Sequence, residues 1–223
     1  MELTSLKSDS LHNPILFHNF HGENIELLEH RQRALRRASF EKGVVFSERP
    51  LDENEYFFVS IETVEGGWSG HLRVGLTIVQ PDLRPSISDF ERNSWLLSVS
   101  PSMVPNSEPA SHALPTEEGS LIGVYYERLT GRPRLHVVLN GFDVCPDVGH
   151  IPSDQLLYAA VDVFGSTKEI RVVLPHPREP NKLSSLCYAK VNCMVQEGKC
   201  SASLLPGPIR CAMEKATAKI YRF

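Results

Sequence analysis

The chain has 223 residues, of which 41% are hydrophobic and 22% charged, which is typical of a globular protein. Its net charge of −4 gives no electrostatic support for binding nucleic acid, and no apolar run is long enough to predict a membrane span. Residues 1–10 lack the apolar core of a secretory signal peptide. We therefore expect a cytoplasmic protein with reduced cysteines.

Composition and turn signals divide the chain into four parts. Residues 1–13 are polar and predicted to be disordered, and residues 14–175 are predicted to form one β-rich domain. Residues 176–181 are predicted to form a proline-rich linker. Residues 182–223 are predicted to form a tail, in which the apolar residues recur with the spacing of a helix rather than of a strand.

The domain is predicted to consist of about ten short strands, with no long helix before residue 181. They fall within residues 15–28 (two strands with a turn at 21–23), 31–40, 43–51, 55–62, 68–77, 95–99, 121–127, 132–143, 157–164 and 167–174. The almost wholly apolar segment 157–164 is typical of a strand buried on both faces. This pattern favours an all-β fold, an antiparallel β-sandwich.

Two dipeptides predict hairpins. Asn140-Gly141 is the strongest short turn signal in the chain. Gly66-Gly67 is expected to join strand 55–62 to strand 68–77, in which Trp68 would share one face with Leu72, Val74 and Leu76. For Trp68 and for Trp95 we favour a place in the core over a role as ligand platforms.

Four irregular segments are the expected places for recognition, because loops carry recognition in such sandwiches. They are 63–67, 80–92, 100–118 and 140–150, of which 100–118 is the longest and the one expected to be mobile. The target that they would bind is unknown from the sequence.

No catalytic motif is present: the sequence has no nucleophile elbow, phosphate loop or zinc-protease helix. His18 and His21 would point to opposite faces of a strand, which disfavours a shared metal. Asp162 lies in an apolar strand, either as a catalytic base or, as we favour, as a carboxylate that accepts backbone N–H bonds from a neighbouring loop. No cofactor is predicted.

Segment 31–40, which carries five basic residues if His30 is added, allows two interpretations, a nucleic-acid arm or the solvent-facing residues of a strand. Acidic residues flank it closely and the chain is net negative, so the second is favoured.

The tail has the apolar spacing of an amphipathic helix, beginning after the N-cap Asn181 and ending at Gly198. Its apolar residues are Leu183, Leu186, Cys187, Val191, Met194 and Val195. A lone helix of this length is marginal in water, so either the domain or another protein must cover this face.

The tail also carries four of the five cysteines, namely Cys187, Cys193, Cys200 and Cys211. They lack the C-x2-C spacing of a zinc knuckle, so no metal site is predicted. The same spacing excludes a RING finger.

The order of the tail residues adds a resemblance. Leu183-x-x-Leu186-Cys187-x-x-x-Val191 resembles the elongin-binding box of the SOCS-box family, and Leu205-Pro206-Gly207-Pro208 resembles that family's cullin-selecting Leu-Pro-x-Pro. The resemblance implies that elongin C, with elongin B, binds Leu183, Leu186, Cys187 and Val191. It implies that a cullin, usually cullin-5 with its RING subunit, binds Leu205, Pro206 and Pro208. Lys182 and the segment after Pro208 depart from the family pattern.

Five segments of the domain resemble, in order, the signatures of a neuralized homology repeat. They are 17–27, 38–51, 68–77, 137–143 and 158–171. Members of this family fold as a concanavalin-like sandwich, related to the SPRY sandwich, and bind other proteins. The resemblance therefore implies the same fold and a protein-binding role for residues 14–175.

The two resemblances together imply a non-catalytic, substrate-recognition subunit of an elongin B/C–cullin–RING ubiquitin ligase. Its sandwich would capture an unidentified target protein. An alternative is a binding adaptor without a ligase role, whose C-terminal helix packs on its own sandwich. A third hypothesis is an enzyme, for instance a hydrolase, that uses His and Asp residues in a cleft.

Overall fold

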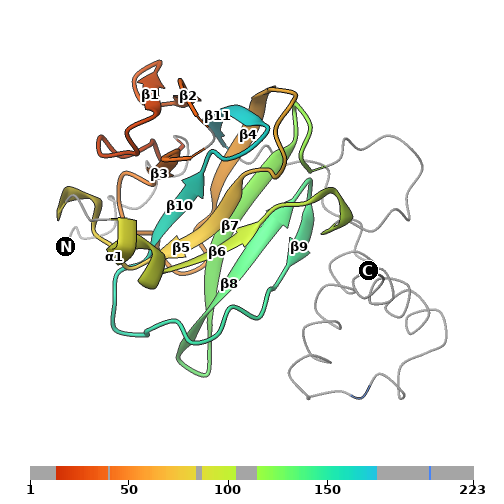
Figure 1. The fold of residues 1–223 in the computed structure, drawn as a ribbon. Coiled ribbons are helices and arrows are strands. Elements are labelled where there is room, and N and C mark those ends of the chain that lie inside the picture. The colour runs from red at the N-terminus through yellow and green to blue at the C-terminus, as the bar shows by residue number, and fades with distance from the viewer. Residues whose placement is uncertain (1–13, 40, 84–86, 104–114, 175–200, 202–223) are drawn as a thin grey trace, which may run out of the picture.

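The computed structural model describes residues 14–39, 41–83, 87–103, 115–174 and 201. Within these residues, two antiparallel sheets pack face to face (Figure 1). The larger sheet has the order β1 (Ile25–Leu28), β2 (Arg33–Arg36), β11 (Thr167–Val173), β4 (Phe57–Val64), β7 (Leu121–Leu129), β8 (Arg132–Leu139) and β9 (Phe142–Val144). The smaller sheet has the order β3 (Val44–Phe46), β10 (Tyr158–Asp162), β5 (Arg73–Thr77) and β6 (Ser94–Ser98). The prediction of an all-β antiparallel sandwich is confirmed.

The core lies between the sheets and is built from alternate residues of each strand, as the period of two requires. Fully buried members include Ile61, Leu76, Ile122, Val137, Leu139, Ala159, Val161 and Ile170. All five residues of β10 are buried. The prediction that segment 157–164 contains a strand buried on both faces is therefore confirmed.

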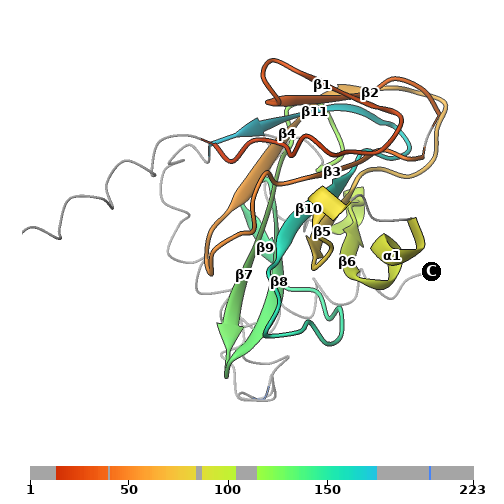
Figure 2. The same ribbon diagram turned by 90° about the vertical axis from the view of Figure 1, so that its left-hand side faces the viewer.

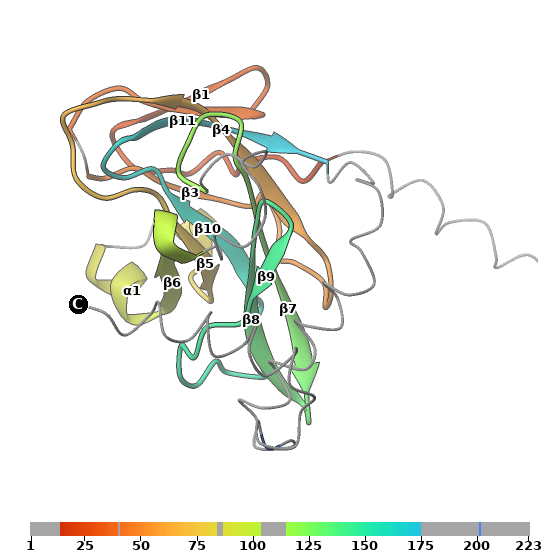
Figure 3. The same cartoon turned by 90° about the vertical axis from the view of Figure 1, so that its right-hand side faces the viewer.

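The large sheet is strongly curved. Figures 2 and 3 show β1 and β2 bending over the edge of the small sheet beside β3. Backbone hydrogen bonds from Gly22 N to Val44 O (2.7 Å) and from Asn24 N to Lys42 O (3.2 Å) close this edge. Of the two strands expected in 15–28, only β1 forms, and Phe17 makes a single bridge to Ser47.

The hairpin at Asn140-Gly141 is confirmed. Both residues have positive φ (49° and 91°), and Leu139 pairs directly with Phe142, so the connection is a two-residue turn. Two consecutive positive φ values match the right-handed twist of the flanking strands, which is why this dipeptide favours hairpins.

The prediction of a hairpin at Gly66-Gly67 is wrong. β4 pairs with β11 and β7 in the large sheet, whereas β5 pairs with β10 and β6 in the small one. Residues 65–72 therefore cross from one sheet to the other, and Gly165-Ser166 makes a second crossing from β10 to β11. A glycine pair permits a sharp change of direction but does not decide whether the strands on either side pair.

Segment 80–92 is not a simple loop. It contains a 3-10 turn, η1 (Pro81–Leu83), and a short helix, α1 (Ile87–Arg92), on the outer side of the small sheet (Figures 2 and 3). A second 3-10 turn, η2 (Pro101–Met103), follows β6. None of the helices in these described ranges is long and apolar enough to cross a membrane.

Candidate protein-binding site

One end of the sandwich gathers the loops 65–72, 115–120, 140–141 and 163–166, and we call it the Trp68 end. Its centre is the contact between the two crossing loops. Glu65 N donates to Ser166 O (2.7 Å), and Ser166 N donates to Gly70 O (3.0 Å). Gly165 has a positive φ of 58°, and a Cβ there would lie 2.4 Å from Gly70 O, so only glycine fits at this crossing.

Arg36 holds the second crossing loop from inside the protein. Its guanidinium donates through Nη2 to Gly165 O (2.6 Å) and Thr167 O (3.1 Å), and the side chain is fully buried. This burial lowers the pKa of Arg36. Arg36 belongs to the basic segment predicted to face solvent, and for this residue the prediction is wrong, since it shares the inward face of β2 with Ala34.

Asp162 and Arg73 form a second clamp at this end. The buried Asp162 carboxylate accepts a hydrogen bond from Arg73 Nε (2.9 Å), and the guanidinium lies 5.3 Å from the centre of the Phe164 ring. The hydrogen-bond donor to Asp162 is therefore a guanidinium rather than the backbone N–H groups that we expected. A strand pairing decides this, because Arg73 lies directly opposite Asp162 between β5 and β10.

Trp68 lies at the tip of the first crossing loop and is 44% exposed. Its predicted place in the core is wrong, because that prediction assumed a strand where the chain changes sheets. Trp95 packs against the core as predicted. Beside Trp68, the Glu65 carboxylate bonds Lys168 Nζ (3.0 Å), and this bond, helped by Trp68, lowers the pKa of Glu65. An exposed tryptophan on a fixed loop has the properties of a binding anchor.

The structure separates the four loops expected to carry recognition. Segment 63–67, the described part of 100–118 that precedes β7, and the turn 140–141 lie at the Trp68 end. The described parts of segment 80–92 and residues 145–150 lie at the opposite end (Figure 1). A single partner of ordinary interface size would engage one set rather than both.

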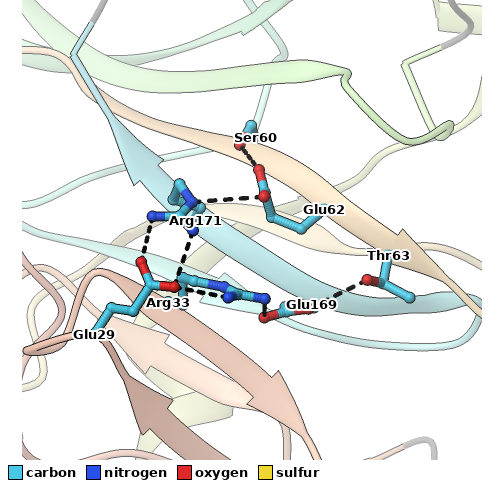
Figure 4. A network of polar contacts seen from close by, with 7 residues as sticks. All are labelled: Glu29, Arg33, Ser60, Glu62, Thr63, Glu169 and Arg171. Carbon is cyan, nitrogen blue, oxygen red and sulfur yellow. Dashed lines mark hydrogen bonds and ion pairs between the residues drawn. The ribbon is translucent and has the colours of Figure 1, made fainter.

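The outer face of the large sheet carries a network of ion pairs across β2, β11 and β4 (Figure 4). Glu29 accepts from Arg33 (2.8 Å) and Arg171 (2.6 Å), and Arg171 reaches Glu62 at 3.5 Å. Hydrogen bonds from Arg171 and then Arg33 lower the pKa of Glu29 to about 2. Arg33 also pairs with Glu169, whose carboxylate accepts from the Thr63 hydroxyl (3.2 Å). Carboxylates of the same chain therefore neutralise Arg33 of the basic segment.

The same face carries a different group of side chains, which extends from the start of β4 across β7 and β8 to β9. We call it the aromatic cluster: Tyr56, Phe58, Tyr125, His136 and Asp143. Tyr125 packs in a tilted arrangement on Tyr56 (4.3 Å between centroids) and stacks on His136 (4.6 Å). The Tyr125 hydroxyl donates to Asp143 Oδ2 (2.7 Å), and His136 Nδ1 lies 3.0 Å from Asp143 Oδ1. Burial raises the pKa of Tyr125, and the Asp143 charge adds to this effect.

The two histidines weighed as a metal pair have separate partners. His18 Nδ1 accepts from Phe20 N (2.9 Å) and its Nε2 lies 3.0 Å from Asp82, whereas His21 Nδ1 lies 2.9 Å from Gly22 O. Within the described ranges, no three His, Cys, Asp or Glu side chains gather as metal ligands.

The predicted partner-binding residues of the tail lie outside the described residues. These are Leu183, Leu186, Cys187 and Val191 for elongin, and Leu205, Pro206 and Pro208 for a cullin. Sequence reasoning missed Arg36, which carries no local signal because its carbonyl partners at Gly165 and Thr167 are 129 and 131 residues away. It also missed the contact between His136 and Asp143, which the predicted Asn140-Gly141 hairpin could have indicated, since the two residues face each other diagonally across it.

Comparison with known proteins identifies the family of this chain. The Neuralized family model matches residues 17–174. Neuralized-like protein 2 from mouse is 32% identical over 78% of this chain and 82% of its own length. The E3 ubiquitin-protein ligase NEURL1B from mouse is 31% identical over 68% of this chain and 27% of its own length. The chain belongs to the Neuralized family.

A solved structure agrees with the fold. The crystal structure of the NHR1 domain of Drosophila melanogaster neuralized superposes with a TM-score of 0.59 at 22% identity, over 73% of this chain and 99% of that domain. Signature segments 68–77 and 158–171 supply Gly70, Gly165 and Ser166 of the Trp68 end. In segment 38–51, a Cβ on Gly43 would lie 2.3 Å from Val163 O. Arg36 and Glu65 lie outside these segments.

Proposed function

We propose that this chain is the substrate-recognition subunit of a ubiquitin ligase complex. The sandwich captures a target protein, and the tail binds elongin C with elongin B and a cullin that carries the RING subunit. The observation that carries the proposal is the pairing of a Neuralized-family domain with Leu-x-x-Leu-Cys and Leu-Pro-x-Pro segments in one chain. Relatives of this chain named as E3 ubiquitin-protein ligases support the pathway.

In this proposal the chain promotes ubiquitination by holding the target protein close to the ubiquitin-charged enzyme. The cysteine and histidine spacing of the chain does not provide the ligands of a RING finger, so the ubiquitin-charged enzyme must come through the cullin. The receptor raises the effective concentration of target lysines near the thioester. No catalytic residue on this chain is required.

The Trp68 end is the surface that we propose for target capture. Arg36 and the paired crossing loops fix the backbone before a partner arrives, which reduces the entropy lost on binding. Trp68 then offers a large apolar side chain beside the charged pair of Glu65 and Lys168. Aromatic anchors surrounded by polar groups carry most of the affinity in protein interfaces.

Co-expression with elongin B and elongin C, followed by size-exclusion chromatography with mass analysis, tests the assembly. We expect a 1:1:1 complex from the unaltered chain. Leu186→Asp combined with Cys187→Phe should abolish it, because a charge and a larger ring would occupy the proposed elongin face. Trp68→Ala is the matched control and should leave the complex intact, since Trp68 belongs to the sandwich.

A well-folded chain that forms no complex would favour the alternative, an adaptor without a ligase role. A complex that persists in the double variant would reject the assignment of Leu186 and Cys187 to the elongin face.

A further inference from the structure

The two sheets have four edges in the described part of the chain, and three of these edges are protected from pairing. At β3, the N–H groups of His18 and Gly22 donate to the carbonyls of the strand (2.8 and 2.7 Å). β1 carries the charged Glu26, and β9 has only three residues with the charged Asp143 at its centre. β6 is the exception, because its sequence Ser-Trp-Leu-Leu-Ser has no charge and no proline, and it pairs with β5 in an unbroken register. Charges, prolines, bulges and short strands are the features that keep natural sheet edges from pairing.

The hydrogen bonds at the two ends of the β5–β6 pairing set its pattern. Ile78 N donates to Asn93 O (3.1 Å) at one end. Val99 N donates to Leu72 O (3.0 Å) at the other end. Bonded and non-bonded pairs alternate along an antiparallel ladder, so every second residue between 93 and 99 is bonded to β5.

This alternation fixes which backbone groups of β6 point out of the sheet. Trp95 and Leu97 are the residues bonded to β5, and their side chains pack against the core. Ser94, Leu96 and Ser98 therefore direct their N–H and C=O groups away from β5, and none of the described strands pairs with them. Their side chains lie on the outer face of the small sheet, where Leu96 is half-buried.

The sequence of β6 reads almost the same in both directions. In an antiparallel pair of two β6 strands centred on Leu96, Ser94 lies opposite Ser98 of the second copy, and Trp95 lies opposite Leu97 of the second copy. Leu96 lies opposite itself. Each of the outward-directed residues then meets another outward-directed residue, so this register makes every hydrogen bond that the edge offers. A surface that matches itself in this way is what a twofold interface requires.

The charges of the small sheet are compatible with the same arrangement. Arg73 of β5 lies opposite Ser98, and its guanidinium is already paired with Asp162 of the same copy. The central row, which runs towards the edge through Ala160, Gly75 and Leu96, is uncharged. Within this sheet, no charge of one copy would therefore face a like charge of the other.

We propose that β6 forms the contact of a symmetric dimer of this chain, in which the two small sheets join edge to edge. The occupant of the edge is a second copy because β6 matches itself in register, polarity and charge. A five-residue strand buries a small area, so the dimer is weak and depends on concentration. The dimer carries two sandwiches, and a partner with two recognition segments is bound with increased avidity.

Sedimentation equilibrium of the full-length chain in the presence of a reducing agent measures the mass. We expect 25.0 kDa at about 1 µM and a rise towards twice this mass at about 500 µM. Leu96→Lys and Leu96→Glu should each stay monomeric at the higher concentration, because like charges then meet at the twofold axis. An equimolar mixture of the two variants should recover the dimer, because opposite charges meet. Leu156→Lys is the matched control, at a leucine outside β6 that is 58% exposed, and should dimerise like the unaltered chain.

Amide hydrogen exchange of the unaltered chain decides if a Leu96 variant does not fold. At the higher concentration, the N–H groups of Ser94, Leu96 and Ser98 should exchange at least about fivefold more slowly, and this factor should exceed that of Trp95 and Leu97, which are already bonded to β5. A chain that stays at 25.0 kDa at every concentration overturns the proposal and leaves the β6 edge to an extended segment of a target protein. A dimer that persists in Leu96→Lys, or a mixture of the two variants that stays monomeric, overturns pairing through β6.

Discussion

The outer face of the large sheet carries two different arrangements of charged side chains, one on each side of β4. On one side, Glu29, Arg33, Glu62, Glu169 and Arg171 alternate in sign and neutralise one another near the surface (Figure 4). On the other side, the His136 imidazolium is buried beside the Tyr125 ring, with the carboxylates of Asp143 at 3.0 Å and Glu127 at 3.4 Å. Water can replace an exposed member of the first arrangement, such as Glu29, whereas the buried His136 of the second has no such replacement.

The largest effect should come from crowding the aromatic cluster. Gly123 lies under Phe58, and a Cβ there would come within 2.3 Å of the ring. Gly123→Val should therefore lower the free energy of unfolding by about 2–3 kcal/mol, measured by urea denaturation. Gly66→Ala is the control, since a Cβ at Gly66 meets nothing within 4 Å. Equal effects of the two substitutions would contradict the tight packing of Phe58 on β7.

The next effect concerns pH. The folded pKa of His136, about 10, exceeds its ordinary value of 6.5. The charged imidazole thus stabilises the fold below pH 6.5, and this contribution is lost as pH rises towards 10. We expect urea denaturation to show a loss of about 1–2 kcal/mol across this range, within the size of a buried charged hydrogen bond.

Asp143→Asn is the matched variant for this pH dependence. It keeps a side chain of the same shape but removes the charge that favours the imidazolium, so the stability should vary less with pH between 6.5 and 10. An unchanged pH dependence would mean that another group titrates in this window.

The smallest expected effect on stability comes from Glu29 in the network of ion pairs. The pKa of Glu29, about 2, lies below its ordinary value of 4.5, so its contribution is present above pH 4.5 and lost as pH falls towards 2. Glu29→Gln should flatten this acid limb slightly, and the difference should shrink in 1 M salt because the pair is exposed. The same acid limb in both proteins would show that Glu29 contributes nothing to stability.

Local patterns predicted those parts of the fold that depend on local chemistry. Alternation located most strands, the Asn140-Gly141 turn follows from its own φ values, and the composition of 157–164 is enough to predict a buried strand. The Neuralized family and the sandwich were predicted from signature segments, whose glycines mark close approaches of the backbone.

The errors share a physical cause, which is distance along the chain. Gly66-Gly67 cannot specify whether β4 and β5 pair, because that choice depends on β7, β10 and β11. Arg36 has the surroundings of a surface residue in the sequence, and its buried carbonyl partner at Thr167 is 131 residues away. Trp68 was misplaced for the same reason, since its exposure follows from the crossing between sheets.

The position of β11 has a consequence for synthesis of the protein. β11 is the last strand of the sandwich in the described residues, yet it pairs with β2 on one side and β4 on the other. Until residue 173 has left the ribosome, the first two strands have no place in the large sheet, and β4 has an open edge. The nascent domain must therefore stay incomplete through almost its whole translation, and an early stop codon before β11 would yield a chain for chaperones and proteases rather than a smaller working domain.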